Sequence, residues 1–463
     1  MSERTRYEKL LLPFEGQKEY MNARIKDGIE ANRKAFATFI AVDKDGKPVT
    51  NAKIRLKQKN HEFQHGANIF MLDELETPEK NAEYKKRFAE AFNLATLPFY
   101  WDAFEPEDGK PRFAADSEKV YRRPASDLCI NYCREHGIEP KLHCLNYDLF
   151  RPAWLTEKYL TNAEIKKRLS RRMAEIAEHY ADAIPGIEVI NETLCWGSQI
   201  PLENRRDNRY YGLLAEPEIV EWSFKEAEKY FPHNELIINE ATFAWLHDFK
   251  YDRTPYYMQI ERALLKGARI DTIGFQNHFW WNKGDDEEAN EAKTYYDPYR
   301  IYEALDTFAK LGKPLQITET TFPTPYKEGD DLAEAEAVQA EIVKNMYSIW
   351  FSHPAVKGAI YWNLVDGYAW GATQGDMTKG ENFLRGGLLR FDLTPKPSFE
   401  VLKKLFNEEW HTDEIAETNE FGTAFIKAFY GDYDLEIVND GKTEISPFKF
   451  TKGNTEKTFR LVL

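Results

Sequence analysis

Short apolar runs alternate with longer amphipathic segments through most of the chain. The apolar runs lie at residues 65–70, 92–101, 138–145, 187–192, 235–240, 270–278, 314–319 and 357–364. Between them, segments such as 161–184 and 333–353 place apolar residues three and four positions apart, which is typical of amphipathic helices. Strands too apolar to have a solvent-facing side indicate a parallel sheet covered by helices. Eight such repeats predict a closed α/β fold, the (β/α)8 TIM barrel.

The two ends of the chain follow a different pattern. Residues 34–58 alternate apolar and polar side chains around the turn sequence Asp-Lys-Asp-Gly-Lys-Pro, which predicts a β-hairpin. After about residue 411, several short strands are separated by Gly-Asp, Asn-Asp-Gly and Lys-Gly-Asn turns. We therefore predict an N-terminal segment with a hairpin over residues 1–63, a barrel over 64–408, and C-terminal strands over 409–463. The C-terminal strands are predicted to pack with the hairpin as a small β-sandwich. For this sandwich, a role in supporting the barrel is favoured over carbohydrate binding.

Composition narrows the classes of partner. The 463 residues include 77 acidic and 62 basic side chains, so nucleic acid is not an expected partner, because phosphate binding needs concentrated Lys and Arg. No stretch approaches the roughly 20 apolar residues needed to cross a bilayer, so no membrane partner is expected either. The first residues lack the apolar core of a signal peptide, which predicts a cytoplasmic protein, although removal of a signal would leave the same sequence. Oligomeric state is not predicted.

Neither a metal nor a cofactor is predicted. The four cysteines have neither metal-site nor disulfide-framework spacing, and Cys129 and Cys133 lie four residues apart on a predicted helix, which favours buried free thiols. His143 and His278 have no partners at the spacing of metal ligands.

Two of the apolar strands end on a glutamate, Glu192 on the fourth and Glu319 on the seventh. Barrel enzymes carry their reacting groups at the C-terminal ends of the strands, where the βα loops meet. Two carboxylates across one cleft are what glycoside hydrolysis requires: one protonates the leaving oxygen, and the other attacks the anomeric carbon or activates water. A single glutamate at a strand end is more often an ion-pair partner, but two on these strands favour catalysis. Glu240, after Asn239 on the fifth strand, is a weaker competitor that the sequence does not exclude.

Several motifs, in order along the chain, resemble glycoside hydrolase family 10, the retaining endo-β-1,4-xylanases. Val-Ile-Asn-Glu192 resembles the acid/base motif of that family, Ile-Thr-Glu319-Thr its nucleophile motif, and Gln276-Asn-His278 its strand-six motif. Residues 143–155, 361–370 and 387–405 resemble its strand-three, strand-eight and closing segments. The likeness spans about residues 65–406 and implies a glycosidase that acts on an oligosaccharide.

The resemblance implies a role for individual residues. Glu192 would act first as general acid and then as general base, and its apolar surroundings favour the protonated form that the first step needs. Glu319 would be the nucleophile that forms a covalent glycosyl-enzyme. Asn191 would bind the sugar 2-hydroxyl, Gln276 would support Glu192, and His278 would hold Glu319 ionised and oriented. The other implied sugar contacts are His143 at the cleaved bond and a platform of Trp362 and Trp370.

The chain departs from the family on the glycone side of the cleft. On strand two, Leu97 and Tyr100 stand where the family has an Asn and a Lys that grip the sugar, while Trp101 is retained. After strand three, the Trp-His pair of the family is replaced by Tyr147 and Asp148. Tyr100, Trp101, Tyr147 and Asp148 are therefore candidate substrate contacts, and the hypothesis is a specificity shifted from plain xylan.

These inferences predict a retaining β-glycoside hydrolase acting on xylan-derived or decorated β-1,4-xylo-oligosaccharides by double displacement. Two alternatives stay open: a β-glycosidase of another specificity, such as a cellulase or mannanase, and a non-catalytic carbohydrate-binding barrel. The sugar at each subsite and the choice of endo or exo action are not predicted.

Overall fold

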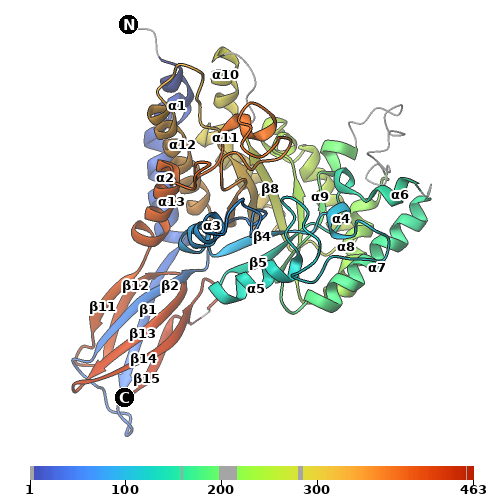
Figure 1. The fold of residues 1–463 in the computed structure, drawn as a ribbon. Coiled ribbons are helices and arrows are strands. Elements are labelled where there is room, and N and C mark those ends of the chain that lie inside the picture. The colour runs from blue at the N-terminus through green and yellow to red at the C-terminus, as the bar shows by residue number, and fades with distance from the viewer. Residues whose placement is uncertain (1–4, 158–159, 198–215, 280–284, 455) are drawn as a thin grey trace.

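Eight parallel strands close into a barrel at the centre of the molecule (Figure 1). The computed structural model describes residues 5–157, 160–197, 216–279, 285–454 and 456–463. The barrel strands are β3 (Gln64–Asn68), β4 (Leu94–Pro98), β5 (Glu139–His143), β6 (Gly186–Asn191), β7 (Glu235–Glu240), β8 (Thr272–His278), β9 (Leu315–Thr321) and β10 (Val356–Tyr361). They neighbour one another in chain order, and β10 closes the ring on β3. Each overlaps one predicted apolar run, so the predicted TIM barrel is confirmed.

Helices cover the outside of the barrel and return the chain from one strand to the next. The longer ones are α3 (Pro78–Ala91), α5 (Ser126–His136), α7 (Asn162–Tyr180), α8 (Ile219–Tyr230), α9 (Pro255–Leu265), α11 (Pro298–Ala309), α12 (Leu332–Ser352) and α13 (Pro397–Lys404). Shorter or additional helices are α4 (Trp101–Phe104), α6 (Ala153–Glu157) and α10 (Asp285–Tyr295). Side-chain caps fix where several of them begin: Thr161 and Glu164 form a capping box on α7, and Asp331 caps α12.

A second unit, built from both ends of the chain, is a two-sheet β-sandwich. One sheet has the order β12-β1-β15 and the other β11-β2-β13-β14. These strands are β1 (Lys34–Val42), β2 (Lys53–His61), β11 (Asp413–Glu417), β12 (Thr423–Phe429), β13 (Gly431–Asn439), β14 (Lys442–Phe450) and β15 (Thr458–Val462). The sandwich has its own apolar core, which includes Phe39, Leu56, Ile426 and Leu435.

The predicted hairpin over residues 34–58 is wrong, because β1 and β2 lie in opposite sheets. The turn itself forms: the Asp43 carboxylate accepts hydrogen bonds from the backbone N–H groups of Asp45 and Lys47, at 2.9 and 2.8 Å. The chain then crosses to the other sheet, where β2 pairs with β11 and β13. An alternating pattern buries one face of a strand equally well against any antiparallel partner, so it predicts a strand but not its neighbour.

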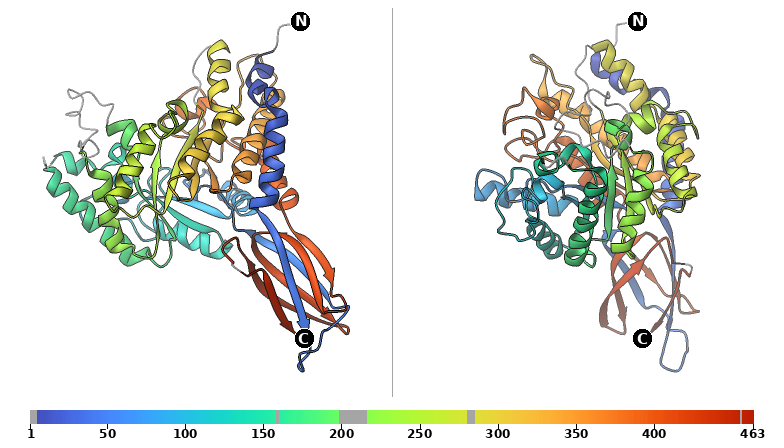
Figure 2. Two further views of the ribbon diagram at one scale, coloured as in Figure 1. Left: turned by 180° about the vertical axis from the view of Figure 1, so that it is seen from behind. Right: turned by 90° about the vertical axis from the view of Figure 1, so that its right-hand side faces the viewer.

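The first helices belong with the barrel rather than with the sandwich. α1 (Arg6–Gly16) and α2 (Lys18–Asn32) run along the barrel beside α12, and Leu10, Phe14 and Met21 enter the main core (Figure 2). Residues 1–63 are therefore divided between the barrel, which α1 and α2 cover, and the sandwich, which contains β1 and β2. At the junction, buried Arg33 donates hydrogen bonds to the carbonyl oxygens of His353 and Val356, at 2.7 and 2.5 Å.

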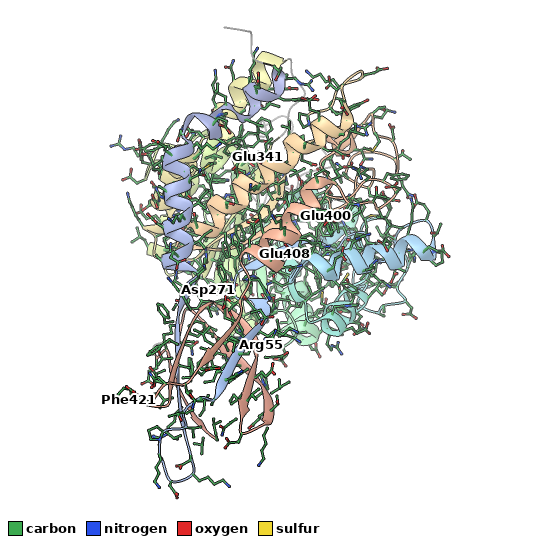
Figure 3. All side chains as sticks on the ribbon, turned by 90° about the vertical axis from the view of Figure 1, so that its left-hand side faces the viewer. Arg55, Asp271, Glu341, Glu400, Glu408 and Phe421 are labelled. Atoms are coloured by element: carbon green, nitrogen blue, oxygen red, sulfur yellow. The ribbon has the colours of Figure 1, made fainter. Side chains whose placement is uncertain are left out.

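The sandwich projects from one end of the barrel, with Arg55 and Phe421 on its surface, while Glu341 and Glu400 mark α12 and α13 above it (Figure 3). β2 ends at His61 and β3 begins at Gln64, so the sandwich joins the N-terminal ends of the parallel strands. The groups at the C-terminal strand ends therefore lie at the other end of the barrel. Structural support stays our prediction for the sandwich.

Two further expectations concern buried thiols and membrane spans. Cys129 and Cys133 are free and buried on α5, as predicted. Among the described residues, no helix combines the length and the hydropathy that a membrane span needs.

Candidate active site

Glu192 and Glu319 line one cavity of about 390 Å³ at the C-terminal end of the barrel. Glu319 is part of β9 and is 4% exposed, and Glu192 follows directly after β6 and is half-buried. The backbone of Glu192 has φ +55°, a left-handed conformation that is strained for a residue with a side chain. Strain of this kind persists only where surrounding contacts impose it, and it is frequent at functional sites.

Hydrogen bonds fix the Glu192 carboxylate from two sides. The Tyr147 hydroxyl donates to Oε2 at 2.6 Å, and the Gln276 amide donates to Oε1 at 2.7 Å. Behind it, Glu240 holds the π-helical turn Thr193–Gly197 by accepting hydrogen bonds from the backbone N–H of Leu194 at 2.8 Å and the Thr193 hydroxyl at 3.2 Å. Glu240 is fully buried and does not line the cavity. The competitor glutamate thus supports the loop that presents Glu192.

Glu319 lies in a denser and more buried network. Asn239 Nδ2 donates to Oε1 at 2.9 Å and to Asn191 Oδ1 at 2.9 Å, and His278 Nε2 lies 3.2 Å from Oε2. Burial raises the pKa of Glu319 to about 8, opposed by the positive charge of His143 and reinforced by the negative charges of Glu188 and Glu192. The site therefore holds several carboxylates whose repulsion makes a shared proton favourable.

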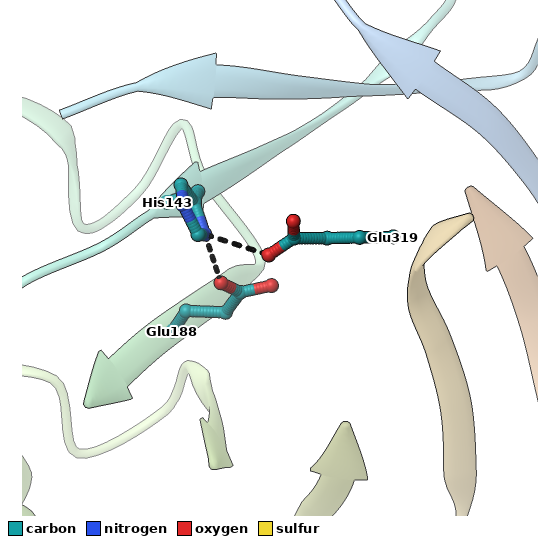
Figure 4. Close-up of side chains that lie close together, drawn as sticks. All are labelled: His143, Glu188 and Glu319. Atoms are coloured by element: carbon teal, nitrogen blue, oxygen red, sulfur yellow. Dashed lines mark hydrogen bonds and ion pairs between the residues drawn. The ribbon is translucent and has the colours of Figure 1, made fainter. Parts of the chain in front are cut away.

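The Glu188 and His143 side chains lie next to Glu319, and His143 contacts both glutamates (Figure 4). The Glu188 carboxylate is bonded by Lys141 Nζ and by His143 Nδ1, and His143 Nδ1 lies 3.9 Å from Glu319 Oε1. Burial by itself raises the pKa of Glu188, but Lys141 and His143 outweigh it and hold that pKa below its ordinary value. Glu188 therefore stays ionised, which keeps His143 oriented beside the second catalytic candidate.

His278 is held as a neutral imidazole. Burial lowers its pKa to about 4. Its Nδ1 lies 3.1 Å from the Thr321 hydroxyl. The Thr321 hydroxyl lies within reach of both this nitrogen and the carbonyl oxygen of Trp362, at 3.2 Å from the latter. When it donates to Nδ1, the ring proton is on Nε2, which then donates to the ionised Glu319 carboxylate.

Aromatic rings form the floor and one wall of the cavity. Trp362 is buried and packs edge-on against Phe70 and His143, with ring centroids 5.1 and 5.3 Å apart. The Tyr100 hydroxyl lies 3.1 Å from His143 Nε2. Trp370 also lines the cavity but is 49% exposed, so its ring has a face available for a ligand. Apolar ring faces beside a few fixed polar groups are typical of a site that binds sugars or other small molecules.

Comparison with known proteins identifies the family. The model of glycosyl hydrolase family 10 matches residues 62–404. The chain belongs to glycosyl hydrolase family 10. This confirms the resemblance seen in the motifs, and the matched range is the barrel without the sandwich.

Individual members and neighbours of glycosyl hydrolase family 10 are distant in sequence. The chain is 25% identical to endo-1,4-beta-xylanase B of Thermotoga neapolitana over 351 residues, which cover 75% of this chain and 88% of that protein. It is 23% identical to anti-sigma-I factor RsgI6 of Acetivibrio thermocellus over 416 residues, and it spans 46% of that protein's length. The solved structure of xylanase 10B from Thermotoga maritima shares the fold with a TM-score of 0.57 at 22% identity, covering 75% of this chain and 96% of that one.

The cavity of this family 10 barrel gathers most of the residues predicted from sequence. Those that line it are Tyr100, His143, Tyr147, Asn191, Glu192, Gln276, His278, Glu319, Trp362 and Trp370. Two candidate substrate contacts are not among them. Trp101 is buried, with its indole N–H donating to Glu105 at 2.8 Å, and Asp148 is fully buried at the start of the 3-10 turn Asp148–Phe150. Each follows a tyrosine that faces the cavity, and consecutive side chains in these turns point in different directions.

Several residues of the site were missed by sequence reasoning. Asn239 was noted only as the neighbour of Glu240, although it joins Asn191 to Glu319. Lys141 and Glu188 could have been found from the sequence. A charged residue inside an otherwise apolar buried strand needs a partner of opposite charge, and each of these two lies in such a strand. Arg122 and Arg123 also line the cavity, from a loop whose sequence has no strand or helix pattern to place it.

Two groups have features of a metal site. His143, Glu188 and Glu319 have ligand atoms within 4.8 Å of one another, but Glu188 is already bonded by the Lys141 ammonium, whose charge would oppose a cation. The His-Glu-x-x-His sequence at residues 61–65 has the spacing of a zinc motif, which the prediction of no metal overlooked. That motif needs a helix, whereas His61 ends β2 and His65 lies in β3, where it stacks on Phe406 at 3.9 Å between ring centroids. Neither group fits a metal well.

The pH dependence of the reaction is expected to report Glu319. Attack needs the ionised carboxylate, and below a pKa of about 8 the ionised fraction of the free enzyme falls about tenfold per pH unit. With an aryl β-glycoside whose leaving group needs no proton from Glu192, we expect the acidic limb of kcat/KM to lie far above the ordinary glutamate value. His143→Asn removes the side chain that opposes the rise in the pKa of Glu319, so it should move the limb to higher pH. A limb at or below pH 5 in the unchanged protein would contradict this assignment.

Proposed function

We propose that this chain is a retaining β-glycoside hydrolase that acts on xylan-derived or decorated β-1,4-xylo-oligosaccharides. The observation that carries the proposal is one cavity in which Glu192 and Glu319 face the same space from β6 and β9 with different hydrogen-bond partners. Glu192 is bonded by Tyr147 and Gln276 in a partly open position, and Glu319 by Asn239 and His278 in a buried one. The family and the names of the xylanases it resembles support the choice of substrate.

In the first step, Glu319 attacks the anomeric carbon while Glu192 gives its proton to the leaving oxygen. Asn239 donates a hydrogen bond to the Glu319 carboxylate and His278 Nε2 lies 3.2 Å from it, and these two contacts orient the carboxylate for attack. The oxygen of the Asn191 amide accepts hydrogen bonds from Asn239 at 2.9 Å and Gln276 at 3.3 Å. Its NH2 group is thereby turned to donate, and a sugar 2-hydroxyl is the acceptor that retaining glycosidases bind at this stage.

In the second step, water hydrolyses the covalent glycosyl-enzyme. Glu192, now ionised, takes a proton from water, the resulting hydroxide attacks the anomeric carbon, and Glu319 leaves as a carboxylate. Two inversions give net retention of the β configuration. Trp362 and Trp370 supply ring surface beside the reacting sugar.

Proton NMR of the anomeric signals during hydrolysis of xylotetraose tests the function. The β-anomer should appear first and then mutarotate to the equilibrium mixture. Initial release of the α-anomer would show an inverting reaction and overturn the double displacement. Binding of xylotetraose without turnover at any pH between 5 and 9 would favour a carbohydrate-binding barrel.

A further inference from the structure

We propose that the substrate carries a carboxylate, on or next to the sugar that is attacked, and that Arg123 binds it with help from Arg122. This inference rests on the proposed function and names the class of glycoside. The carboxylate belongs to an acidic sugar, either as the reacting unit or as a branch on a neutral backbone.

Two consecutive arginines line the catalytic cavity while being almost fully buried. Arg122 is 6% exposed and Arg123 is 8% exposed. The backbone of Arg122 is left-handed, with φ +62°. A strained conformation at this residue indicates that the fold holds the pair in place rather than letting either side chain extend into solvent.

Neither arginine has a carboxylate within 4.0 Å in the part of the chain that the structure describes. Arg122 donates to the carbonyl oxygen of Tyr368 and to Asn363 Oδ1, the latter at 3.0 Å. Arg123 donates to the carbonyl oxygen of Arg122 at 2.9 Å. All these acceptors are neutral. A buried cation is normally paired with an anion, because leaving water costs several kcal/mol.

Glu381, which lines the same cavity, acts on both arginines from beyond ion-pair distance, and Asp102 acts on Arg123; these carboxylates oppose the effect of burial on the arginine pKa values only in part. The Glu381 carboxylate accepts a hydrogen bond from Asn363 at 2.5 Å, and Asp102 accepts one from the backbone N–H of Ala103 at 2.6 Å. Burial lowers the pKa of Arg123 to about 10, so the guanidinium still carries its charge at neutral pH. Among the described residues no carboxylate is bonded directly to Arg123, and we expect the ligand to supply one.

The shape of the Arg123 site suits a carboxylate. Its guanidinium carbon lies over the Tyr100 ring, 3.9 Å from the ring centroid, with the centroids of Phe70 and Phe150 at 5.2 and 5.3 Å. The rings hold the guanidinium by cation–π contact, which uses none of its N–H donors, and among the described residues the guanidinium donates one hydrogen bond, from Nη1 to the carbonyl oxygen of Arg122. A planar fork of N–H donors matches the two oxygens of a carboxylate.

The position of Arg123 indicates how close the substrate carboxylate would lie to the bond that is cleaved. Tyr100 lies against Arg123 and, through its hydroxyl, contacts His143, which in turn lies 3.9 Å from Glu319. A second cavity of about 740 Å³ adjoins the first and shares Arg122, Arg123, Phe150 and Trp370 with it. This space is large enough for a branch sugar, so a uronic acid branch on a xylose chain fits both cavities.

Substrates that differ only in the carboxyl group measure the effect of its negative charge on turnover. The probes are a xylo-oligosaccharide with a glucuronic acid branch, the same compound with its carboxyl reduced to an alcohol, and an aryl β-glucuronide that places the carboxylate on the reacting sugar. We expect the unchanged protein to prefer the acidic branched compound over its reduced form by at least about tenfold in kcat/KM. Arg123→Gln should bring that ratio close to one. Arg55→Gln, an exposed arginine of the sandwich paired with Asp413, is the control and should leave the ratio unchanged.

Binding separates this inference from the proposed function. Calorimetry on Glu319→Gln measures affinity for the acidic and reduced compounds without any turnover, and a preference for the acidic compound supports the inference even where no glycoside is hydrolysed. Equal affinity and equal kcat/KM for the two compounds would overturn it. Faster turnover of the aryl glucuronide than of the branched compound places the carboxylate on the reacting sugar and still supports it. If Arg123→Gln does not fold, the ratio of kcat/KM for the acidic and reduced compounds in the unchanged protein tests the inference by itself.

Discussion

Replacement of Glu319 by alanine is expected to reduce kcat by roughly four to six orders of magnitude, because the covalent route is lost and no other described carboxylate of the cavity sits on β9. Added azide fills the space left by the side chain and attacks the anomeric carbon directly. The expected product is the α-glycosyl azide, since a single displacement inverts the configuration. Product NMR with an activated aryl β-glycoside measures both the rescue and its stereochemistry.

Glu319→Gln is the matched control for structure. It keeps the shape of the side chain, and it removes a buried carboxyl group that Glu188 and Glu192 disfavour in its charged form. The midpoint of thermal unfolding should therefore stay the same or rise slightly while activity is lost. Turnover within tenfold of the unchanged protein in both variants would remove Glu319 from the nucleophile role.

Replacement of Glu192 by alanine should give the second largest effect, and one that depends on the leaving group. Natural oligosaccharides leave as poor, basic alkoxides, so loss of the general acid should reduce kcat/KM by roughly 10²–10⁴-fold. A dinitrophenyl glycoside needs no protonation to leave, so its first step should change little and the glycosyl-enzyme should accumulate as a burst. Azide should now give the β-glycosyl azide, because the covalent intermediate still forms.

Glu240→Gln provides the comparison for Glu192, since each glutamate follows an asparagine at the C-terminal end of a barrel strand. Glu240 accepts hydrogen bonds from Leu194 and Ala241 and lies outside the cavity, and burial raises its pKa to about 8. Its replacement should loosen the turn after Glu192 and lower kcat/KM by a similar factor for good and poor leaving groups. A strong leaving-group dependence in Glu240→Gln, absent in Glu192→Ala, would exchange the two assignments.

The sequence predicts those residues of the candidate site whose location follows from their position along a barrel strand. Glu192 directly follows a buried strand and Glu319 lies near the C-terminal end of another, and the ends of parallel barrel strands meet at one face, so their approach follows from the repeat pattern. The pattern does not give the direction of side chains in the loops after the strands. Tyr100 and Tyr147 face the cavity while Trp101 and Asp148, one residue later, are buried away from it. Such directions depend on the turn that each loop adopts.

The sequence by itself determined the barrel, because a strand buried on both faces must be a continuous apolar run and eight of these alternate with amphipathic helices. It also determined the two strand-end carboxylates. Only the tertiary structure decided which partners the sandwich strands take, since an alternating strand pairs equally well with several neighbours. It also decided the meeting of Asn239 with Glu319, and of Arg123 with Tyr100, because those contacts join segments far apart in the chain whose local patterns carry no information about each other.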